Sequence, residues 1–405
     1  MTGGQIGNVD LVKQLNGAAV YRLIDLEGPI SRIQIADASS LAPASVTKIT
    51  RQLLERGLIK EVAQQASTGG RRAISLKTES APFHALAVRL GRDRIELALF
   101  DLSGKLLAQY AENFDYHDQT SLMEGLYQHI TDFLGNHKDL VRELVAISIS
   151  LPGLVDAVAG IVEYMPNIDV DNLKMSQLIS DRFEAQCYIG NDTRCKALAE
   201  HYFGASRHYQ DSILVSVHNG TGAGIIVNGQ VFLGINRNVG EIGHIQIDPL
   251  GKKCQCGNFG CLETVASNSA IVEHAEQLLG LGHKSLLADH TDKLTVSDIC
   301  KAANADDALA KEVLQKVGNQ LGKAIAITIN LFNPQQIVLA GEITESEEIL
   351  VSAIRRCIEG QSLRTFHQNL PIVSSELSDT PTIGPFALVK RAMLNGTLLQ
   401  KLLEH

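Results

Sequence analysis

The chain has 405 residues, 45% of them hydrophobic, and a formal net charge of −9. This length suggests two to four compact units, and the absence of a long apolar run or a secretory leader predicts a soluble, cytoplasmic protein. The acidic balance excludes general nucleic-acid affinity for the whole chain, but the charge is uneven. Residues 1–77 carry ten Lys and Arg against six Asp and Glu, whereas the remainder carries 26 against 39, so a basic front end precedes an acidic body.

Two helices are predicted at the start of the chain. Residues 8–27 repeat apolar side chains at helical spacing, and Gly28-Pro29 ends that helix. A short second helix follows Ser31, which is a good N-cap residue. The side chains of this helix that we expect to pack inward are Ile33, Ile35 and Ala36.

A third helix is predicted from Pro43, which suits a first helical turn, to Gly57. Its apolar face consists of Val46, Ile49, Leu53 and Leu54. Its other face carries Ser45, Thr47, Lys48 and Arg51. Small hydroxyls and long cations near a helix N-terminus suit base reading and phosphate anchoring, so we interpret this helix as a DNA recognition helix.

A wing is predicted next, with strands at residues 58–62 and 71–76 joined by a polar, glycine-bearing tip. Arg71 and Arg72 follow that tip, where they would reach into a narrow minor groove. Residues 1–80 therefore indicate a winged helix-turn-helix domain that binds double-stranded operator DNA. The alternative is a winged helix with a solvated charged face that binds another protein.

The rest of the chain predicts an α/β body with an internal duplication. Residues 83–108 and 212–232 each form a strand-turn-strand-turn-strand pattern, and helical and strand segments follow both. We expect one lobe at residues 81–195 and a second at 196–382. The amphipathic C-terminal segment, residues 383–405, is predicted to return to the first lobe as a closing helix that packs between lobes or subunits.

A cysteine cluster lies in the second lobe. Cys254, Cys256 and Cys261 follow His244 closely, and three thiolates with one imidazole suit a closed, tetrahedral Zn²⁺ site that is structural rather than catalytic. The alternative is three buried apolar cysteines beside a loop histidine. A disulfide is disfavoured because Cys254 and Cys256 are too close in sequence to pair comfortably.

Several motifs together resemble the ROK family of bacterial repressors and sugar kinases over nearly the whole chain. They are Leu151-Pro152-Gly153, Asn191-Asp192, Gly220-Thr221-Gly222, Glu241-Ile242-Gly243-His244, and the cysteine loop ending in Leu262-Glu263. The resemblance implies a two-lobed actin/hexokinase-like (ribonuclease H-like) body. It also implies sugar-binding roles for Gly153, Asn191, Asp192, Glu241, His244 and Glu263, whose carboxylate, amide and imidazole groups suit hydroxyl recognition.

Two departures from the family's kinases predict that the chain is not an enzyme. Arg89 and Asp93 stand where the kinases have the Asp and Thr of their phosphate turn, and a cation cannot ligate Mg²⁺. Glu342 stands where they tend to have glycine near the adenosine. The retained turn Gly220-Thr221-Gly222 could still hold an anion, and Arg194 is a candidate ligand for a sugar phosphate, with a helix-surface arginine as the alternative.

The front end and the C-terminal run resemble the amino-sugar-responsive repressors of the family. This resemblance implies N-acetylglucosamine 6-phosphate as inducer, repression of amino-sugar uptake and catabolism genes, and activation of some genes. The alternatives are a glucose-responsive repressor of sugar-transport genes, a zinc sensor and an ATP-dependent sugar kinase. Winged helices usually bind operators in pairs, so we expect a homodimer or a homotetramer.

Overall fold

The computed structural model describes residues 9–63, 74–166, 168–234, 239–289 and 292–404. The chain forms two compact units. One consists of Met1–Asn191 with Pro385–His405, and the other is Asp192–Gly384. Residues 1–80 thus belong to the same unit as the first lobe and the C-terminal helices. None of the helices within the described ranges is long and apolar enough to cross a bilayer.

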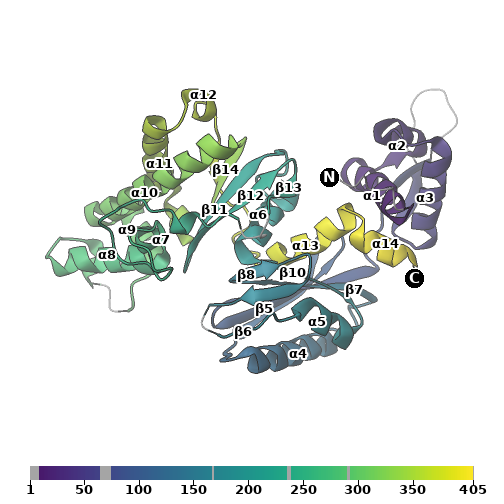
Figure 1. Ribbon diagram of the computed structural model, residues 1–405, viewed down its shortest axis with the longest axis horizontal. Coiled ribbons are helices and arrows are strands. Elements are labelled where there is room, and N and C mark those ends of the chain that lie inside the picture. The colour runs from purple at the N-terminus through teal and green to yellow at the C-terminus, as the bar shows by residue number, and fades with distance from the viewer. Residues whose placement is uncertain (1–8, 64–73, 167, 235–238, 290–291, 405) are drawn as a thin grey trace, which may run out of the picture. The chain divides into compact units, whose positions relative to one another are not determined.

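The front end of the first unit is a winged helix, with three helices and a small antiparallel sheet (Figure 1). The helices are α1 (Val9–Glu27), α2 (Arg32–Ser39) and α3 (Pro43–Glu55), and the strands are β1 (Ile30–Ser31), β2 (Ile59–Ala63) and β3 (Ile74–Thr78). The predicted N-cap is confirmed. The Ser31 side chain accepts a hydrogen bond from the Gln34 amide, while the Gln34 side chain accepts one from the Ser31 amide at 3.0 Å.

Three details of the front end differ from the predictions. Ile33 is 75% exposed rather than packed inward, because only Ile35 and Ala36 of α2 face the core. In α3, Ile49 and Leu54 are only half-buried, and the polar residue Thr50 is buried beside the predicted Leu53. Thr50 is satisfied there because its hydroxyl accepts a hydrogen bond from Arg32 Nε at 3.1 Å.

The first lobe contains a five-stranded sheet in the order β10-β7-β4-β5-β6. Its strands are β4 (Phe83–Leu90), β5 (Arg94–Asp101), β6 (Leu106–Asn113), β7 (Glu143–Leu151) and β10 (Gln186–Asn191). The first three form an antiparallel meander, and β7 and β10 add in parallel. Two helices accompany the sheet, α4 (Gln119–Asn136) and α5 (Met175–Phe183), together with the hairpin of β8 (Leu154–Asp156) and β9 (Ile161–Tyr164).

The second unit contains a sheet with the same plan, in the order β13-β12-β11-β14-β15. Its strands are β11 (Ser212–Val217), β12 (Thr221–Val227), β13 (Gln230–Val231), β14 (Gln336–Ala340) and β15 (Ile372–Ser374). Again a three-stranded antiparallel meander is followed by two parallel strands. This repeated order confirms the duplication that the two sequence patterns predicted.

Helices and short turns build the rest of the second unit. They are α6 (Asp192–Phe203), η1 (Ile242–His244), α7 (Glu263–Ala266), α8 (Asn268–Gly280), η2 (Leu286–Asp289), α9 (Val296–Asn304), α10 (Ala308–Phe332), η3 (Glu342–Ser346), α11 (Glu347–Gln361) and α12 (Arg364–His367). The central helix is α10, which buries one long apolar face against the core of this unit.

The C-terminal segment forms two helices, α13 (Ile383–Leu394) and α14 (Thr397–Glu404), instead of the single helix predicted. The chain turns at Asn395-Gly396, where Gly396 has φ +88°, a conformation that favours glycine. Phe386 of α13 stacks on Phe100 of β5 with ring centroids 4.7 Å apart, and α14 packs against α1 (Figure 1). The segment therefore joins the first lobe to the winged helix.

Polar contacts reinforce this packing of the C-terminal helices on the winged helix. Arg22 donates a hydrogen bond to the carbonyl oxygen of Leu394 at 2.9 Å, and Gln14 donates one to that of Asn395 at 3.1 Å. Lys390 and Asp25 form an ion pair at 2.7 Å in which both side chains are nearly buried. Such a pair is costly to break on one side, because the other charge would remain buried without a partner.

Candidate functional site

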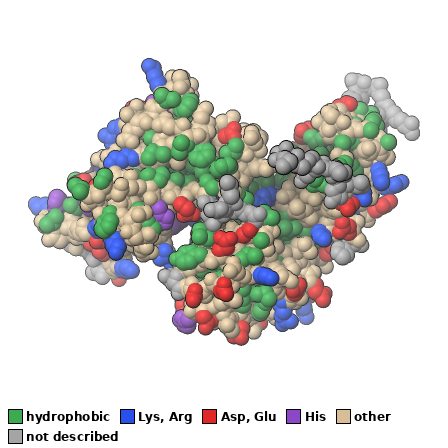
Figure 2. Space-filling view, viewed as in Figure 1, with side chains coloured by type: hydrophobic (Ala, Val, Ile, Leu, Met, Phe, Trp, Pro, Cys, Tyr) green, Lys and Arg blue, Asp and Glu red, His purple; other side chains and the backbone are tan. Residues whose placement is uncertain are grey.

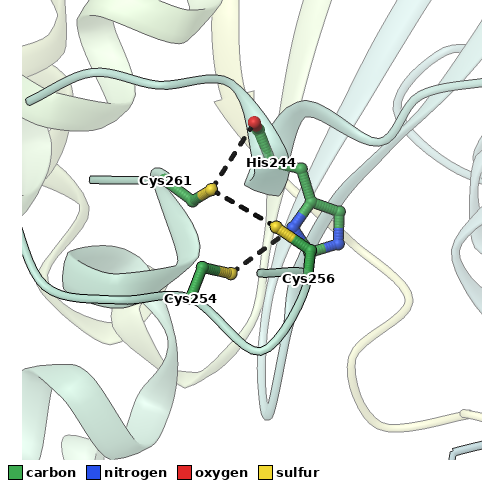
Figure 3. Close-up of side chains that lie close together, drawn as sticks. All are labelled: His244, Cys254, Cys256 and Cys261. Carbon is green, nitrogen blue, oxygen red and sulfur yellow. Dashed lines mark hydrogen bonds between the residues drawn. The ribbon is translucent and has the colours of Figure 1, made fainter. Parts of the chain in front are cut away.

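Four candidate metal ligands lie together in the second unit, as the sequence predicted (Figure 3). The Nδ1 atom of His244 and the Sγ atoms of Cys254, Cys256 and Cys261 all lie within 4.8 Å of one another. Cys254 Sγ is 3.6 Å from His244 Nδ1, and Cys256 Sγ is 3.6 Å from Cys261 Sγ. Tetrahedral zinc with bonds of about 2.3 Å places neighbouring sulfurs about 3.8 Å apart, so these side chains fit a zinc ion with little movement.

The loop that presents the cysteines is held by its backbone. The Cys254 amide donates to the Asn258 carbonyl at 2.7 Å, and the Leu262 amide donates to the Ile245 carbonyl at 2.9 Å. Gly260 has φ +67°, and a Cβ there would lie 1.5 Å from the carbonyl oxygen of Asp248, so only glycine fits. The geometry of the cluster therefore follows from the local chain path.

The cysteines of the cluster differ in their environments. The pKa of the exposed Cys256 thiol is lowered, chiefly by a hydrogen bond from the Asn258 amide, whereas burial raises the pKa of Cys261 to about 12. A metal ion requires thiolates, so its binding here would release at least the proton of Cys261 near neutral pH. His244 directs Nδ1 toward the sulfurs and leaves its other ring nitrogen pointing away from them (Figure 3).

Three of the predicted sugar-binding residues lie near this cluster. Glu241 immediately precedes η1, His244 is the last residue of η1 and itself a member of the cluster, and Glu263 begins α7, next to the Leu262–Ile245 hydrogen bond. Glu263 Oε2 accepts a hydrogen bond from the Thr221 amide at 3.1 Å. The turn 220–222, which was predicted to bind an anion, thus already has one amide, that of Thr221, bonded to the carboxylate of Glu263.

Arg194 is buried, with 7% of its surface exposed, so the alternative of a helix-surface arginine is wrong. Its Nη2 lies 3.4 Å from Glu241 Oε1, and its Nε donates to the Val239 carbonyl at 3.2 Å. Burial is the main influence on its pKa, which is lowered, and Glu241 opposes that shift. The geometry is that of a cation that fixes the position of Glu241.

The other predicted sugar-binding residues are divided between the two units. In the first unit, Asn191 ends β10 and donates from Nδ2 to the carbonyl oxygen of Gly153 at 3.1 Å. Gly153 has φ +110°, and a Cβ there would lie 2.1 Å from the carbonyl oxygen of Tyr164. In the second unit, Asp192 begins α6 and accepts from the Thr193 amide at 2.8 Å. Glycine at 153 thus allows the backbone that Asn191 binds to pass close to the Tyr164 carbonyl.

Arg89 forms an ion pair across the β4–β5 hairpin. Its Nη1 lies 3.2 Å from Glu96 Oε1, and Arg94 approaches the same oxygen at 3.4 Å. The Glu96 side chain is only 13% exposed. Arg89 is therefore fixed in β4 by a local partner, and a guanidinium stands where a divalent cation would need a carboxylate. In the second unit, Glu342 accepts a hydrogen bond from Asn268 at 3.3 Å.

The predicted DNA-reading face of α3 is solvent-exposed. Thr47, Lys48 and Arg51 are exposed, and Ser45 is half-buried. Thr47 donates its hydroxyl hydrogen to the Pro43 carbonyl, and Arg51 lies 3.9 Å from Glu55, with both side chains about 70% exposed. This face is thus accessible to a DNA groove. Arg71 and Arg72, predicted for the wing, lie outside the described residues.

Sequence reasoning missed Arg56, which lies just beyond the end of α3. Its Nε donates to the Leu402 carbonyl at 2.7 Å, its guanidinium pairs with Glu143, and it lies 5.0 Å from the centre of the Phe83 ring. In the sequence Arg56 is a basic residue at the end of a helix, where basic residues are common. Its partners are distant in the chain, so no local pattern could have singled it out.

Comparisons with known proteins agree with this architecture. A family model described as the ROK family matches residues 85–392. The "DNA-binding transcriptional dual regulator NagC" of Escherichia coli K12 is 60% identical over 99% of this chain and 98% of its own length. The "DNA-binding transcriptional repressor Mlc" of the same strain is 40% identical, with the same coverage. A solved ROK family transcriptional regulator, described as a homologue of the E. coli MLC protein, superposes with a TM-score of 0.93 at 43% identity, covering 98% of this chain and all of that one.

Proposed function

Because this chain belongs to the ROK family, and within it to the sugar-responsive DNA-binding transcriptional repressors, we propose that its inducer is N-acetylglucosamine 6-phosphate. It would control genes of amino-sugar uptake and catabolism. The observation that carries this proposal is 60% identity, over almost the full length of both chains, to proteins named N-acetylglucosamine repressor. Identity to the transcriptional repressor Mlc is lower, at 40% over the same span.

The chain is a regulator and not an enzyme, like these relatives. The Arg89–Glu96 ion pair supports this on chemical grounds, because a fixed guanidinium at the end of β4 does not bind Mg²⁺. The exposed cationic face of α3 supports operator binding, with Ser45, Thr47, Lys48 and Arg51 as base and phosphate contacts and Arg71 and Arg72 in the wing. Activation of some genes belongs to the same proposal, in line with the "dual regulator" among the relatives.

The proposed sugar contacts are Gly153, Asn191, Asp192, Glu241, His244 and Glu263. Carboxylates, an amide and an imidazole can each donate to or accept from sugar hydroxyls in a fixed direction. We assign Arg194 to holding Glu241 in place, because its guanidinium already engages that carboxylate and a backbone carbonyl. Gly220, Thr221 and Gly222 remain the proposed contacts of the 6-phosphate, which would have to displace the Glu263 carboxylate from the Thr221 amide.

A structural zinc ion on His244, Cys254, Cys256 and Cys261 completes the proposal. These donors form a closed set of the kind that holds zinc without an open coordination position. With Nδ1 of His244 on the metal, the ring is fixed and its other nitrogen can face a hydroxyl. The metal would shape the sugar site while taking no part in any reaction.

A homodimer or homotetramer would place two recognition helices on one operator. If the inducer favours an arrangement that misplaces these helices, sugar binding and DNA binding oppose each other by one coupling free energy. The protein would then leave its operator when the phosphorylated amino sugar accumulates.

The experiment that tests the proposal is a calorimetric titration of the full-length protein with N-acetylglucosamine 6-phosphate, glucose, free N-acetylglucosamine, and ATP with Mg²⁺. Operator fragments selected from a random DNA library then report release by fluorescence anisotropy. We expect the phosphorylated amino sugar to bind more tightly than free N-acetylglucosamine and to be the one compound that releases DNA. If glucose binds and releases DNA, the protein is a glucose-responsive repressor. If ATP binds together with a free sugar, the protein is a sugar kinase.

A matched pair of variants links the response to the sugar site. Glu263→Gln should lose most of the inducer affinity, because the carboxylate that accepts from Thr221 and faces the sugar would become a neutral amide. Glu276→Gln changes an exposed carboxylate on the neighbouring helix α8 and should leave inducer affinity as it is. Equal responses of the two variants would contradict the assignment of Glu263.

A further inference from the structure

The second unit has a cavity whose lining residues belong to none of the sites described above. Its volume is about 400 Å³, and it is formed by α11, the short helix α12, and the chain entering β15. In Figure 1, α12 lies at the end of this unit, beside α11. A volume of this size falls in the range that small-molecule sites occupy, about 300–1,000 Å³.

The floor of the cavity is apolar and well packed. Ile358, Leu370 and Ile372 are buried, with 2%, 5% and 7% of their surfaces exposed, and each presents a small part of its side chain to the cavity. Such a floor accepts the ring or hydrocarbon part of a ligand. The remaining lining residues are polar and form the rim, namely Arg355, Glu359, Arg364, His367 and Gln368.

The rim carries more positive than negative charge. Arg355 and Arg364 line it together with His367, against the single carboxylate of Glu359. This is unusual in a chain whose formal net charge is −9. Figure 2 shows Lys and Arg side chains at the end of the second unit where α12 lies. An anion would be attracted to this rim.

The cations of the rim are available to a ligand. Arg355 donates from Nη1 to the Leu370 carbonyl at 3.3 Å, which keeps its guanidinium beside the floor and leaves its other donors free of any partner among residues 292–404. Within the described part of the chain, the side chains of Arg364 and His367 make no hydrogen bond and no ion pair, and only their backbone carbonyls accept hydrogen bonds. A guanidinium that has no carboxylate partner presents a planar set of donors matched to two oxygens of a phosphate or carboxylate.

We propose that this cavity, the α11–α12 site, binds a small anionic molecule. Its phosphate or carboxylate group would lie between Arg355 and Arg364, with His367 as a further donor, and its apolar part would lie on Ile358, Leu370 and Ile372. The site shares no residue with the proposed sugar site or with the cysteine cluster. It would therefore give this protein a second ligand, whose apolar part on the buried floor distinguishes it from a sugar.

The test uses phenyl phosphate as the probe, because it combines a phosphate with a flat apolar ring. The full-length protein is titrated calorimetrically with phenyl phosphate, benzoate, inorganic phosphate and phenol, at matched ionic strength and with N-acetylglucosamine 6-phosphate present throughout to occupy the sugar site. We expect saturable binding of phenyl phosphate or benzoate, which distinguishes the two anionic groups, and weaker binding of inorganic phosphate. Phenol, which has no charge, should bind at least about tenfold more weakly than the better anion.

Variants locate the binding. Arg364→Gln and Arg355→Gln should each weaken binding of the preferred anion about tenfold or more. Arg356→Gln is the matched control, because Arg356 lies on the same helix and is exposed but does not line the cavity. The proposal is overturned if no anion binds saturably up to about 10 mM, a concentration well above the ~1 mM scale of weak specific binding. It is also overturned if Arg364→Gln and Arg356→Gln give equal affinities, or if phenol binds as well as the anions.

Discussion

Arg56, just beyond the recognition helix α3, donates a hydrogen bond from Nε to the carbonyl oxygen of Leu402 in the last helix of the chain, at 2.7 Å. The same guanidinium pairs with Glu143 at the start of β7. One side chain therefore connects the helix that faces DNA with the C-terminal helix and with the first lobe. We expect the position of α3, the proposed recognition helix, on the first lobe to depend on this connection.

Replacing Arg56 by Ala should lower the free energy of unfolding by about 1–3 kcal/mol, because it removes charge-assisted hydrogen bonds from a side chain that is only 22% exposed. The measurement is the urea midpoint of unfolding. The matched variant is Arg51→Ala, on the exposed face of α3. It should leave the midpoint unchanged and weaken operator binding. The slope of the logarithm of the binding constant against the logarithm of salt concentration should become shallower by about one. Equal midpoints of the two variants would show that the Arg56 contacts do not stabilise the protein.

The cysteine cluster predicts one zinc ion per chain. Cys256→Ser should lose the metal, and inducer affinity should fall by about tenfold or more, because His244 is no longer fixed by the ion. Elemental analysis and inducer titration measure the two effects. The control is Cys357→Ser, which lies outside the cluster. A Cys256→Ser protein with full inducer response and thermal stability would argue against a structural metal site.

A variant of Arg194 distinguishes two possible roles of this residue, positioning Glu241 and binding the 6-phosphate. If Arg194 positions Glu241, Arg194→Ala should weaken the binding of N-acetylglucosamine and of its 6-phosphate by the same factor. We expect a loss of the order of 1–2 kcal/mol, since Glu241 is half exposed. If it holds the 6-phosphate, only the phosphorylated sugar should weaken. The measurement is the ratio of the two affinities. Arg194→Lys keeps the charge and should recover part of the loss in either case, but only the first role leaves the ratio constant.

His84 predicts a loss of stability in acid. It is almost fully buried in β4, burial lowers its pKa below 6.5, and its Nδ1 accepts a hydrogen bond from the Arg142 amide at 3.3 Å. The unfolded chain therefore takes up a proton at a higher pH than the folded one. As pH falls below about 6.5, this residue should reduce stability by up to about 1.4 kcal/mol per pH unit.

The check is the urea midpoint at several pH values between about 7 and 5. His84→Gln keeps an acceptor for the Arg142 amide but cannot be protonated, so its midpoint should fall less than that of the wild type. His208→Gln, at an exposed position, should follow the wild type. A parallel fall in all three proteins would assign the acid sensitivity to other groups.

Local signals predicted much of the fold. The Ser31 cap, Pro43 at the start of α3 and the two meanders are short-range features, and the structure has all of them. The strand β1 was missed because two residues carry no periodicity, and it exists only because it pairs with β3. The break at Asn395-Gly396 has the composition of a turn, but the strong apolar pattern on either side concealed it.

The candidate site was predicted unevenly for a physical reason. The metal ligands lie within 18 positions of one another, so their spacing alone indicated a common site. The burial of Arg194 depends on Glu241 and Val239, which are more than forty positions away. No pattern along one helix reports such a partner, and the same holds for Arg56 with Leu402.

The packing of α14 on α1 has a consequence for how this protein is made. Gln14 and Asn395 are 381 positions apart, so the first helix can complete this packing only after the segment that forms α14 has been synthesised. A message that is cut short, or a chain clipped near its end, would yield a product whose first helix lacks part of its packing surface. We therefore expect such a chain to hold its winged helix less firmly and to compete poorly with the intact protein for the operator.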